Sequence, residues 1–254
     1  MNDKNDYAKH EIKDIRDMTP DEIEHLNTLG LDDTFHFACK ACGNCCKQRR
    51  DIVLTPYDIF RLAKYLSRTP EEIIKRYCDV YEGENSHFPV VWLMPVPPDD
   101  RCPFLINRKC VVHTAKPVLC RIFPLARIMG KESKGSRFYF NGSSCHHDPK
   151  TTVIRDWIGD VASEDSENAG ILWADIVSGV LSAIHPRTLQ CSKEKRAKIL
   201  NAVFCILWLP YDTEKDFAPQ LEQSATLLRE HMQREFNITI PTGEHSKKGE
   251  HNEG

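Results

Sequence analysis

The sequence predicts a mostly helical α+β protein, in which an irregular cysteine-rich module with short strands adjoins a helical C-terminal part. Three observations lead to this prediction. Four cysteines fall within residues 39–46, CKACGNCC. Residues 88–142 are rich in proline and β-branched residues and contain only short apolar runs. Beyond residue 150, apolar residues recur at helical spacing.

The N-terminal third carries three helix starts of one kind. In each, a threonine precedes a proline at the first helical position, and an acidic residue follows in the first turn. The helices are expected at about 19–30, 56–66 and 70–80, the first of them ending at a glycine.

The middle of the chain is expected to form short strands. The runs PVVWLM, CPFLI, CVVH and RFYFNG have the composition of strands, and Asn107-Arg108 suits a hairpin turn. Helices follow, and prolines 186 and 210 help to delimit them. They are expected at about 151–162, 168–185, 193–209 and 214–236.

These elements suggest an organisation in four parts. They are an N-terminal helical extension (1–30), a cysteine-cluster domain (31–149), a helical C-terminal region (150–241) and a polar tail (242–254) expected to be disordered. The chain of 254 residues is long enough for one large domain or two small ones.

Composition restricts the class of protein. The net charge of -3 gives no reason to expect a nucleic-acid or membrane partner. The N-terminus has no apolar segment typical of a signal peptide, and the run 202–209 is too short to span a bilayer. A cytoplasmic protein is expected, where disulfides are uncommon, so clustered cysteines favour metal or redox chemistry over an exported, disulfide-linked fold.

The first cysteine group, Cys39, Cys42, Cys45 and Cys46, has the pattern C-x2-C-x2-C-C. Its opening CKACG is similar to the turn of zinc ribbons, where the glycine lets backbone N–H groups face the sulfurs. The first three cysteines also have bacterial ferredoxin spacing, but Arg49 stands where the fourth ligand would be. Strain is expected if both adjacent cysteines turn to one metal, which leaves two neighbouring centres or one spare thiolate open.

A second group of cysteines lies downstream, at Cys102, Cys110, Cys120 and, further on, Cys145. Eight cysteines could ligate two four-coordinate metal sites, and thiolates suit both zinc and iron–sulfur clusters. His113 is a possible additional ligand. Since short strands among loops bury little core, we expect the metal to hold this module folded.

The charge pattern gives independent support. Residues 39–50 contain four basic residues, residues 101–131 contain seven, and neither segment contains an acid. Cations near thiols lower their pKa and favour metal loading. A solvated basic face or an anion-binding surface would explain the same pattern.

The two motifs together resemble the bacterial cysteine-cluster family that is named for its CxxCxxCC motif and described as zinc- or iron-chelating. The resemblance covers about residues 35–148 and includes the intervening LTPYDIFRLAKYL. It implies that the eight cysteines are the metal ligands, with Cys120, Arg121, Phe123 and Pro124 matching the family's CRxFP. His113 stands where the family usually has tyrosine, and Lys116 where it often has arginine. A similar module occurs in flagellin lysine methylases.

The remaining candidates are weaker. Cys78, expected on the third helix, and Cys205 are interpreted as small buried residues, and Cys191 as a loop thiol. His146 and His147 could support ligands but suit a surface loop. The sequence contains no phosphate-binding glycine loop, no G-x-S-x-G and no H-E-x-x-H.

Two functions are therefore open. In the first, the cysteines bind zinc or an iron–sulfur cluster in a structural or assembly module, with a protein partner possible. In the second, an iron–sulfur centre serves an oxidoreductase or a protein-modifying enzyme.

Overall fold

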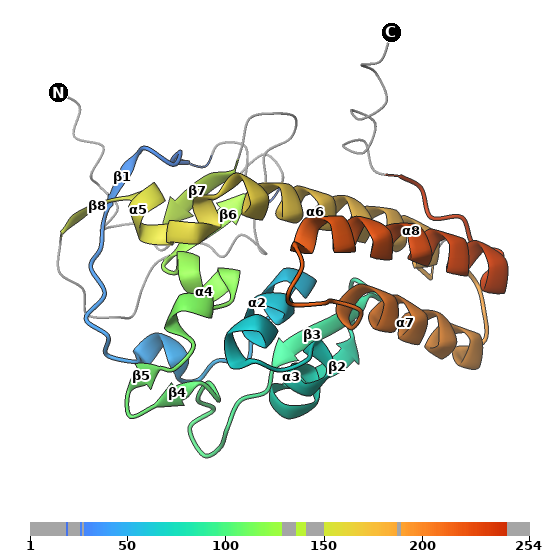
Figure 1. Ribbon diagram of the computed structural model, residues 1–254, viewed down its shortest axis with the longest axis horizontal. Helices are drawn as coiled ribbons and strands as arrows, with labels where there is room; N and C mark the ends of the chain where they lie inside the picture. Colours follow the sequence, from blue (N-terminus) through green and yellow to red (C-terminus); the bar gives the residue numbers. More distant parts are fainter. Residues whose placement is uncertain are drawn as a thin grey trace, which may run out of the picture.

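The computed structural model describes residues 19, 26, 28–128, 136–140, 150–186 and 189–242 of the chain (Figure 1). It confirms a mostly helical α+β fold in which every strand has a single antiparallel partner. Most of the expected first helix (20–25 and 27) and the C-terminal tail from residue 243 lie outside the described residues. The expected helix end at 28–30 is wrong, because Leu29 forms an antiparallel bridge with Phe138 there.

Two helices begin with the expected signature. In α2 (Pro56–Leu66) and α3 (Pro70–Tyr77), the preceding threonine and the acid at the third helical position form a complete capping box. Helix α2 has the predicted bounds. Helix α3 ends three residues before the predicted end, and strand β2 (Cys78–Glu82) pairs with β3 (Pro89–Leu93) instead. Because the chain from Cys78 onward pairs with β3, the helix does not continue, and Cys78 lies on a strand.

The predicted hairpin is confirmed. Strands β4 (Leu105–Ile106) and β5 (Lys109–Cys110) flank Asn107 and Arg108, whose φ angles are 49° and 62°. Two positive φ angles at the centre of a two-residue loop match the right-handed twist of a hairpin.

The rest of the middle region consists of short elements. They are η2 (Asn44–Cys46), η3 (His113–Ala115), α4 (Val118–Ile122), β6 (Leu125–Ile128) and β7 (Arg137–Phe140). The last two form a pair. Strand β1 (Thr34–His36) pairs with β8 (Thr151–Val153), so the expected helix at 151–162 is replaced by that strand, α5 (Ile154–Ile158) and η4 (Gly159–Ala162).

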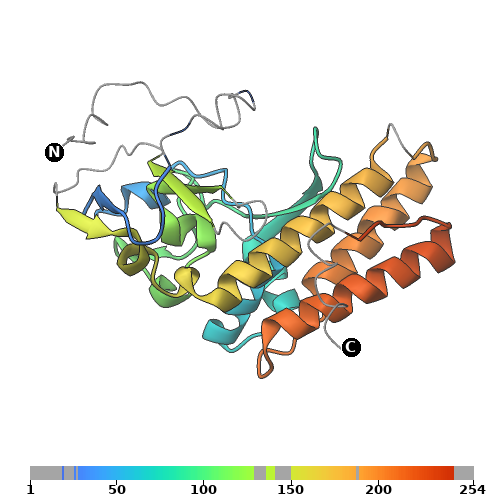
Figure 2. The same cartoon turned by 90° about the horizontal axis from the view of Figure 1, so that it is seen from above.

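Three long helices complete the fold: α6 (Glu164–Ile184), α7 (Lys193–Trp208) and α8 (Phe217–Phe236). Helix α6 begins four residues before the predicted start because Ser163 caps it. Figure 2 shows the three helices side by side at one end of the molecule. None of the helices described has both the length and the apolar character needed to cross a bilayer.

The buried apolar side chains form two clusters. The larger joins α2, α3 and β3 to α6, α7 and α8, and the smaller joins the segment around β1 to α4, β6, β7 and α5. Cys102, Cys110 and Cys120 pack against the larger cluster, whereas Phe37 belongs to the smaller one. The cysteines therefore lie where the two clusters meet. The proposed domain boundary at 149/150 remains a prediction.

Candidate metal centre

A cavity of about 440 Å³ collects both cysteine groups. Six of the eight predicted ligands line it: Cys39, Cys42, Cys45, Cys46, Cys110 and Cys120. Phe37 and Trp157 form an aromatic wall, and the two rings lie edge to face with centroids 5.2 Å apart. Residues more than 60 positions apart in the sequence thus share one site.

The first cysteine loop is shaped by two residues with left-handed backbone. Ala41 has φ 51° and Gly43 has φ 75°. A Cβ atom at position 43 would lie 3.3 Å from Cδ1 of Leu105. The glycine therefore allows both the turn and the close approach of the β4–β5 hairpin.

Backbone hydrogen bonds hold the two cysteine segments together. The N–H of Cys102 donates to the carbonyl of Cys46 at 2.8 Å, and the N–H groups of Gln48 and Arg49 donate to Asp99 and Asp100 at 3.2 Å. These bonds bring Cys102 beside the first loop, although it does not line the cavity itself.

Backbone N–H groups lie close to three of the cysteine sulfurs, in each case from the residue two positions further on. The N–H of Ala41 lies 3.3 Å from Sγ of Cys39. Burial raises the pKa of the Cys102 and Cys110 thiols, and the N–H groups of Phe104 and Val112 oppose that rise. Hydrogen bonds of this kind favour the charged form of the acceptor, which is the form that ligates metal.

The adjacent cysteines lie close together. Their sulfurs, in Cys45 and Cys46, are 3.9 Å apart. Sulfurs at the corners of a tetrahedron around zinc, with Zn–S of about 2.3 Å, would be about 3.8 Å apart. This separation is compatible with both sulfurs binding one ion, and the strain expected from their adjacency remains a prediction.

The thiols are close enough to oppose one another's ionisation. A hydrogen bond with Cys46, followed by burial, raises the pKa of Cys45, and burial together with the nearby Cys102 raises the pKa of Cys120. The side chains of Arg49 and Lys116 oppose the rise at Cys45. A bound cation would remove the cost that crowding imposes on the thiolates. Lys40, Arg108, Lys109 and Arg121 also line the cavity, and compensation of the thiolate charge by these basic residues remains a prediction.

His113 lines the same cavity from η3. The positive charge of Lys116, with smaller contributions from burial and Arg121, lowers the pKa of this imidazole. A neutral imidazole is the form that binds metal. Its role as a ligand remains a prediction.

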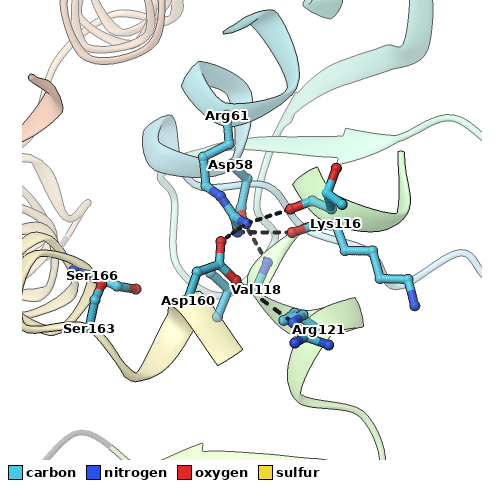
Figure 3. Close-up of polar contacts among 9 residues, drawn as sticks. Asp58, Arg61, Lys116, Val118, Arg121, Asp160, Ser163 and Ser166 are labelled. Carbon is cyan, nitrogen blue, oxygen red and sulfur yellow. Dashed lines mark hydrogen bonds and ion pairs between the residues drawn. The ribbon is translucent and has the colours of Figure 1, made fainter. Parts of the chain in front are cut away.

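A buried polar network, which the sequence analysis did not identify, positions the helix that carries Cys120 (Figure 3). The carboxylate of Asp58 caps α2 and also accepts the N–H of Val118, the first residue of α4, at 2.7 Å. The guanidinium of Arg61 donates to the carbonyl of Lys116 at 3.1 Å and pairs with Asp160. One turn of α2 therefore fixes the start of α4. The only sequence signal was the acid of the capping box.

The predicted ligands do not all reach one point. Among the residues that the structure describes, no three Cys, His, Asp or Glu side chains converge closely enough to hold a single ion. Cys145, His146 and His147 lie outside the described residues. The sulfur donors, the N–H groups directed at them and the nearby cations nevertheless match the chemistry of a thiolate metal site.

The other thiols are separate from this site. Cys78 is 9% exposed and packs in the larger core, as expected. Cys191 lies in the predicted loop. Cys205, expected to be buried, is only half-buried on α7, because the buried face of that helix is formed by residues such as Val203 and Leu207.

Comparison with known proteins agrees with the resemblance drawn from the motifs. Residues 38–146 match the CxxCxxCC family model, described as "Putative zinc- or iron-chelating domain". The matched segment contains all eight predicted cysteine ligands. It supports metal binding and leaves the metal and the role open.

An uncharacterized protein of Methanocaldococcus jannaschii is also similar. It is 28% identical over 90 residues, which are 35% of this chain and 44% of that protein. The chain thus covers less than half of this relative's length. No solved structure matches the chain.

Proposed function

We propose that the chain binds a thiolate-ligated metal centre, zinc or iron–sulfur, that has a structural or assembly role in the cytoplasm. The ligands would be Cys39, Cys42, Cys45, Cys46, Cys102, Cys110, Cys120 and Cys145. The observation that carries the proposal is the single cavity lined by cysteines of both groups. Reduced thiols are available for metal binding in the cytoplasm.

When bound, the metal would neutralise the crowded thiolates and cross-link the first cysteine loop to the β4–β5 hairpin and α4. The chain's own groups support that task. Backbone N–H groups are directed at Cys39, Cys102 and Cys110, and the cations of Arg49 and Lys116 lie near Cys45. These groups partly offset the burial and crowding that raise the pKa of the thiols, and a bound cation would supply the rest.

Zinc is favoured at the Cys45–Cys46 pair by the 3.9 Å separation of the two sulfurs, and the remaining cysteines would complete this site and a second one. This separation is close to the edge of a zinc–thiolate tetrahedron, whereas each iron of a four-iron cluster takes one thiolate. A second candidate, an iron–sulfur oxidoreductase or protein-modifying enzyme, is favoured by the cavity of about 440 Å³, which exceeds the need of one ion.

Elemental analysis of anaerobically purified protein tests the proposal. Zinc without acid-labile sulfide, in colourless protein, supports the structural centre. Iron with equal sulfide, and absorption near 400 nm that dithionite bleaches, supports the second candidate. Protein that is folded and contains neither metal would overturn both.

Serine substitutions test the choice of ligands. Cys42→Ser and Cys120→Ser each remove one thiolate from the cavity and should lower metal content by at least half. Cys205→Ser is the matched control, since this thiol lies on α7, far in sequence from both groups. Equal metal loss from all three variants would contradict the assignment.

A further inference from the structure

A second cavity, of about 610 Å³, lies on the other side of α4 from the cysteines. It is bounded by the start of α2, by α4, by the β6–β7 pair and by α6 and α8. Its size is that of a small-molecule site. Helix α4 and Phe123 lie between this cavity and the cysteine cavity, and Phe123 lines both.

The walls are mainly apolar and aromatic. Trp173, Phe217, Leu221 and Ile122 contribute rings and branched chains. Val53 and Leu119 also line the cavity and are 42% and 45% exposed, which makes an apolar rim. A ligand with a hydrocarbon or aromatic body would gain from burial in these walls.

One buried cation, Arg127, lines this cavity, and one of its nitrogens lacks a hydrogen bond to the described part of the chain. Nη1 of Arg127 has no hydrogen-bond partner among the described residues, and the side chain is 14% exposed. Its nearest carboxylate, in Glu167, lies 3.9 Å away, and both oxygens of that carboxylate accept the Ser136 hydroxyl at 2.8 Å. A buried guanidinium with an unused donor is costly unless a ligand accepts from it.

The other charges around the cavity disfavour a ligand with more than one negative charge. Arg49, Asp51 and Asp58 also line it. Both oxygens of Asp58 already accept hydrogen bonds from Thr55 and Val118, and Asp51 pairs with Arg49. A dianionic phosphate would therefore add two negative charges to three carboxylates that, among the lining residues, only Arg49 and Arg127 offset, whereas a monocarboxylate would add one and accept the unused donor of Arg127.

We propose that this cavity binds a small organic monocarboxylate, with the carboxylate on Arg127 and an apolar or aromatic body between α6 and α8. Ser166, a 2% exposed serine of α6, also lines the cavity and supplies a further hydroxyl. Ligand binding at this site does not require a metal in the neighbouring cavity, so the proposal can be tested independently of the proposed metal centre.

Calorimetric titration of the full chain with 4-phenylbutyrate and with the neutral 4-phenylbutan-1-ol tests this site, with octanoate and indole-3-propionate as further carboxylates. The acid should bind at least about tenfold more tightly than the alcohol. Arg127→Met should remove that preference and leave binding of the alcohol unchanged. Arg234→Gln, on an exposed face of α8, should change neither.

A second variant guards against misfolding of the first. Gly170→Leu places a branched side chain on the cavity wall from α6 and replaces a poor helix former. It should weaken binding of acid and alcohol alike. Equal affinity of wild type for both probes, undiminished binding of the acid by Arg127→Met, or no binding of any of the three carboxylates would each overturn the proposal.

Discussion

The cysteine-bearing segments and the C-terminal helices are built on different sources of stability. Helices α6 to α8 bury fully enclosed side chains such as Val180, Leu221 and Met232 in one large core. The cysteine segments contain elements of two to five residues, and they are connected by backbone hydrogen bonds and half-buried thiols. Apolar burial can stabilise the first region, whereas we expect the second to depend on cross-linking by a bound metal.

The larger core also explains how the two cysteine groups come close together. The chain between them forms α2, α3, β2 and β3, and these pack with the C-terminal helices in the larger core. The cysteine groups are the two ends of that inserted unit. Formation of the larger core therefore brings the ends together before any metal needs to bind.

Removal of metal should have the largest effect and should separate the two regions. Chelation under anaerobic conditions should speed amide hydrogen exchange in residues 39–50 and 101–121 on the order of tenfold or more. Helices α7 and α8 should keep their protection, because the fully buried members of their core include no predicted ligand, and Cys102, Cys110 and Cys120 only pack against it. The measurement is hydrogen exchange with mass spectrometry. Equal loss of protection in both regions would show that the cysteine segments do not depend on metal more than the C-terminal helices do.

Shortening a buried side chain in the helical core should lower stability and leave metal binding unchanged. Leu228, on α8, is 1% exposed, and Leu228→Ala should lower the free energy of unfolding by about 2–5 kcal/mol. Metal content per folded chain should stay unchanged, since no thiol lies near this position in the sequence. Chemical denaturation with zinc and iron analysis measures both. A parallel loss of metal would show that the regions are not independent.

Two capping boxes of one type offer a matched pair of variants. Asp58→Ala removes the cap of α2 and leaves the buried N–H of Val118 without its acceptor, so it should cost about 1–3 kcal/mol and lower metal content. Glu72→Ala removes the corresponding cap of α3, whose acid makes no contact with α4 in the described hydrogen bonds. It should leave metal content unchanged. Similar metal loss in both variants would show that the hydrogen bond from Val118 to Asp58 is not what positions Cys120 for metal binding.

The smallest expected effect concerns the ion pair that joins β2 to α7. Burial of Glu82 acts to raise its pKa, but hydrogen bonds from Arg196 and His87 prevail and lower it. The pair therefore stabilises the fold above the ordinary glutamate pKa of about 4.3, and this contribution is lost as the pH falls through the lowered value. Glu82→Gln should reduce stability at pH 7 by less than about 1 kcal/mol and flatten its fall below pH 5. An unchanged pH profile would contradict this assignment.

Local patterns in the sequence predicted local structure well. The threonine–proline–acid signature defined α2 to the residue, and Asn107-Arg108 defined the hairpin turn, because capping and turn geometry depend on neighbours within four positions. The end of α3 and the strand at 151–153 were predicted wrongly, because each depends on pairing with another strand: β2 with the next strand, β3, and β8 with the distant β1. Pairing energy outweighed local helix preference there.

By itself, the sequence determined which atoms are available for metal chemistry: eight thiols in two groups, seven of them in segments that contain basic residues and no acids. Only the tertiary structure decided that Asp58 holds α4, that Arg61 reaches Asp160, and that Arg127 faces a separate cavity. The physical reason is distance along the chain. The partners of Asp58 and Arg61 are 60 and 99 residues away, and such contacts exist only after the intervening segments have packed.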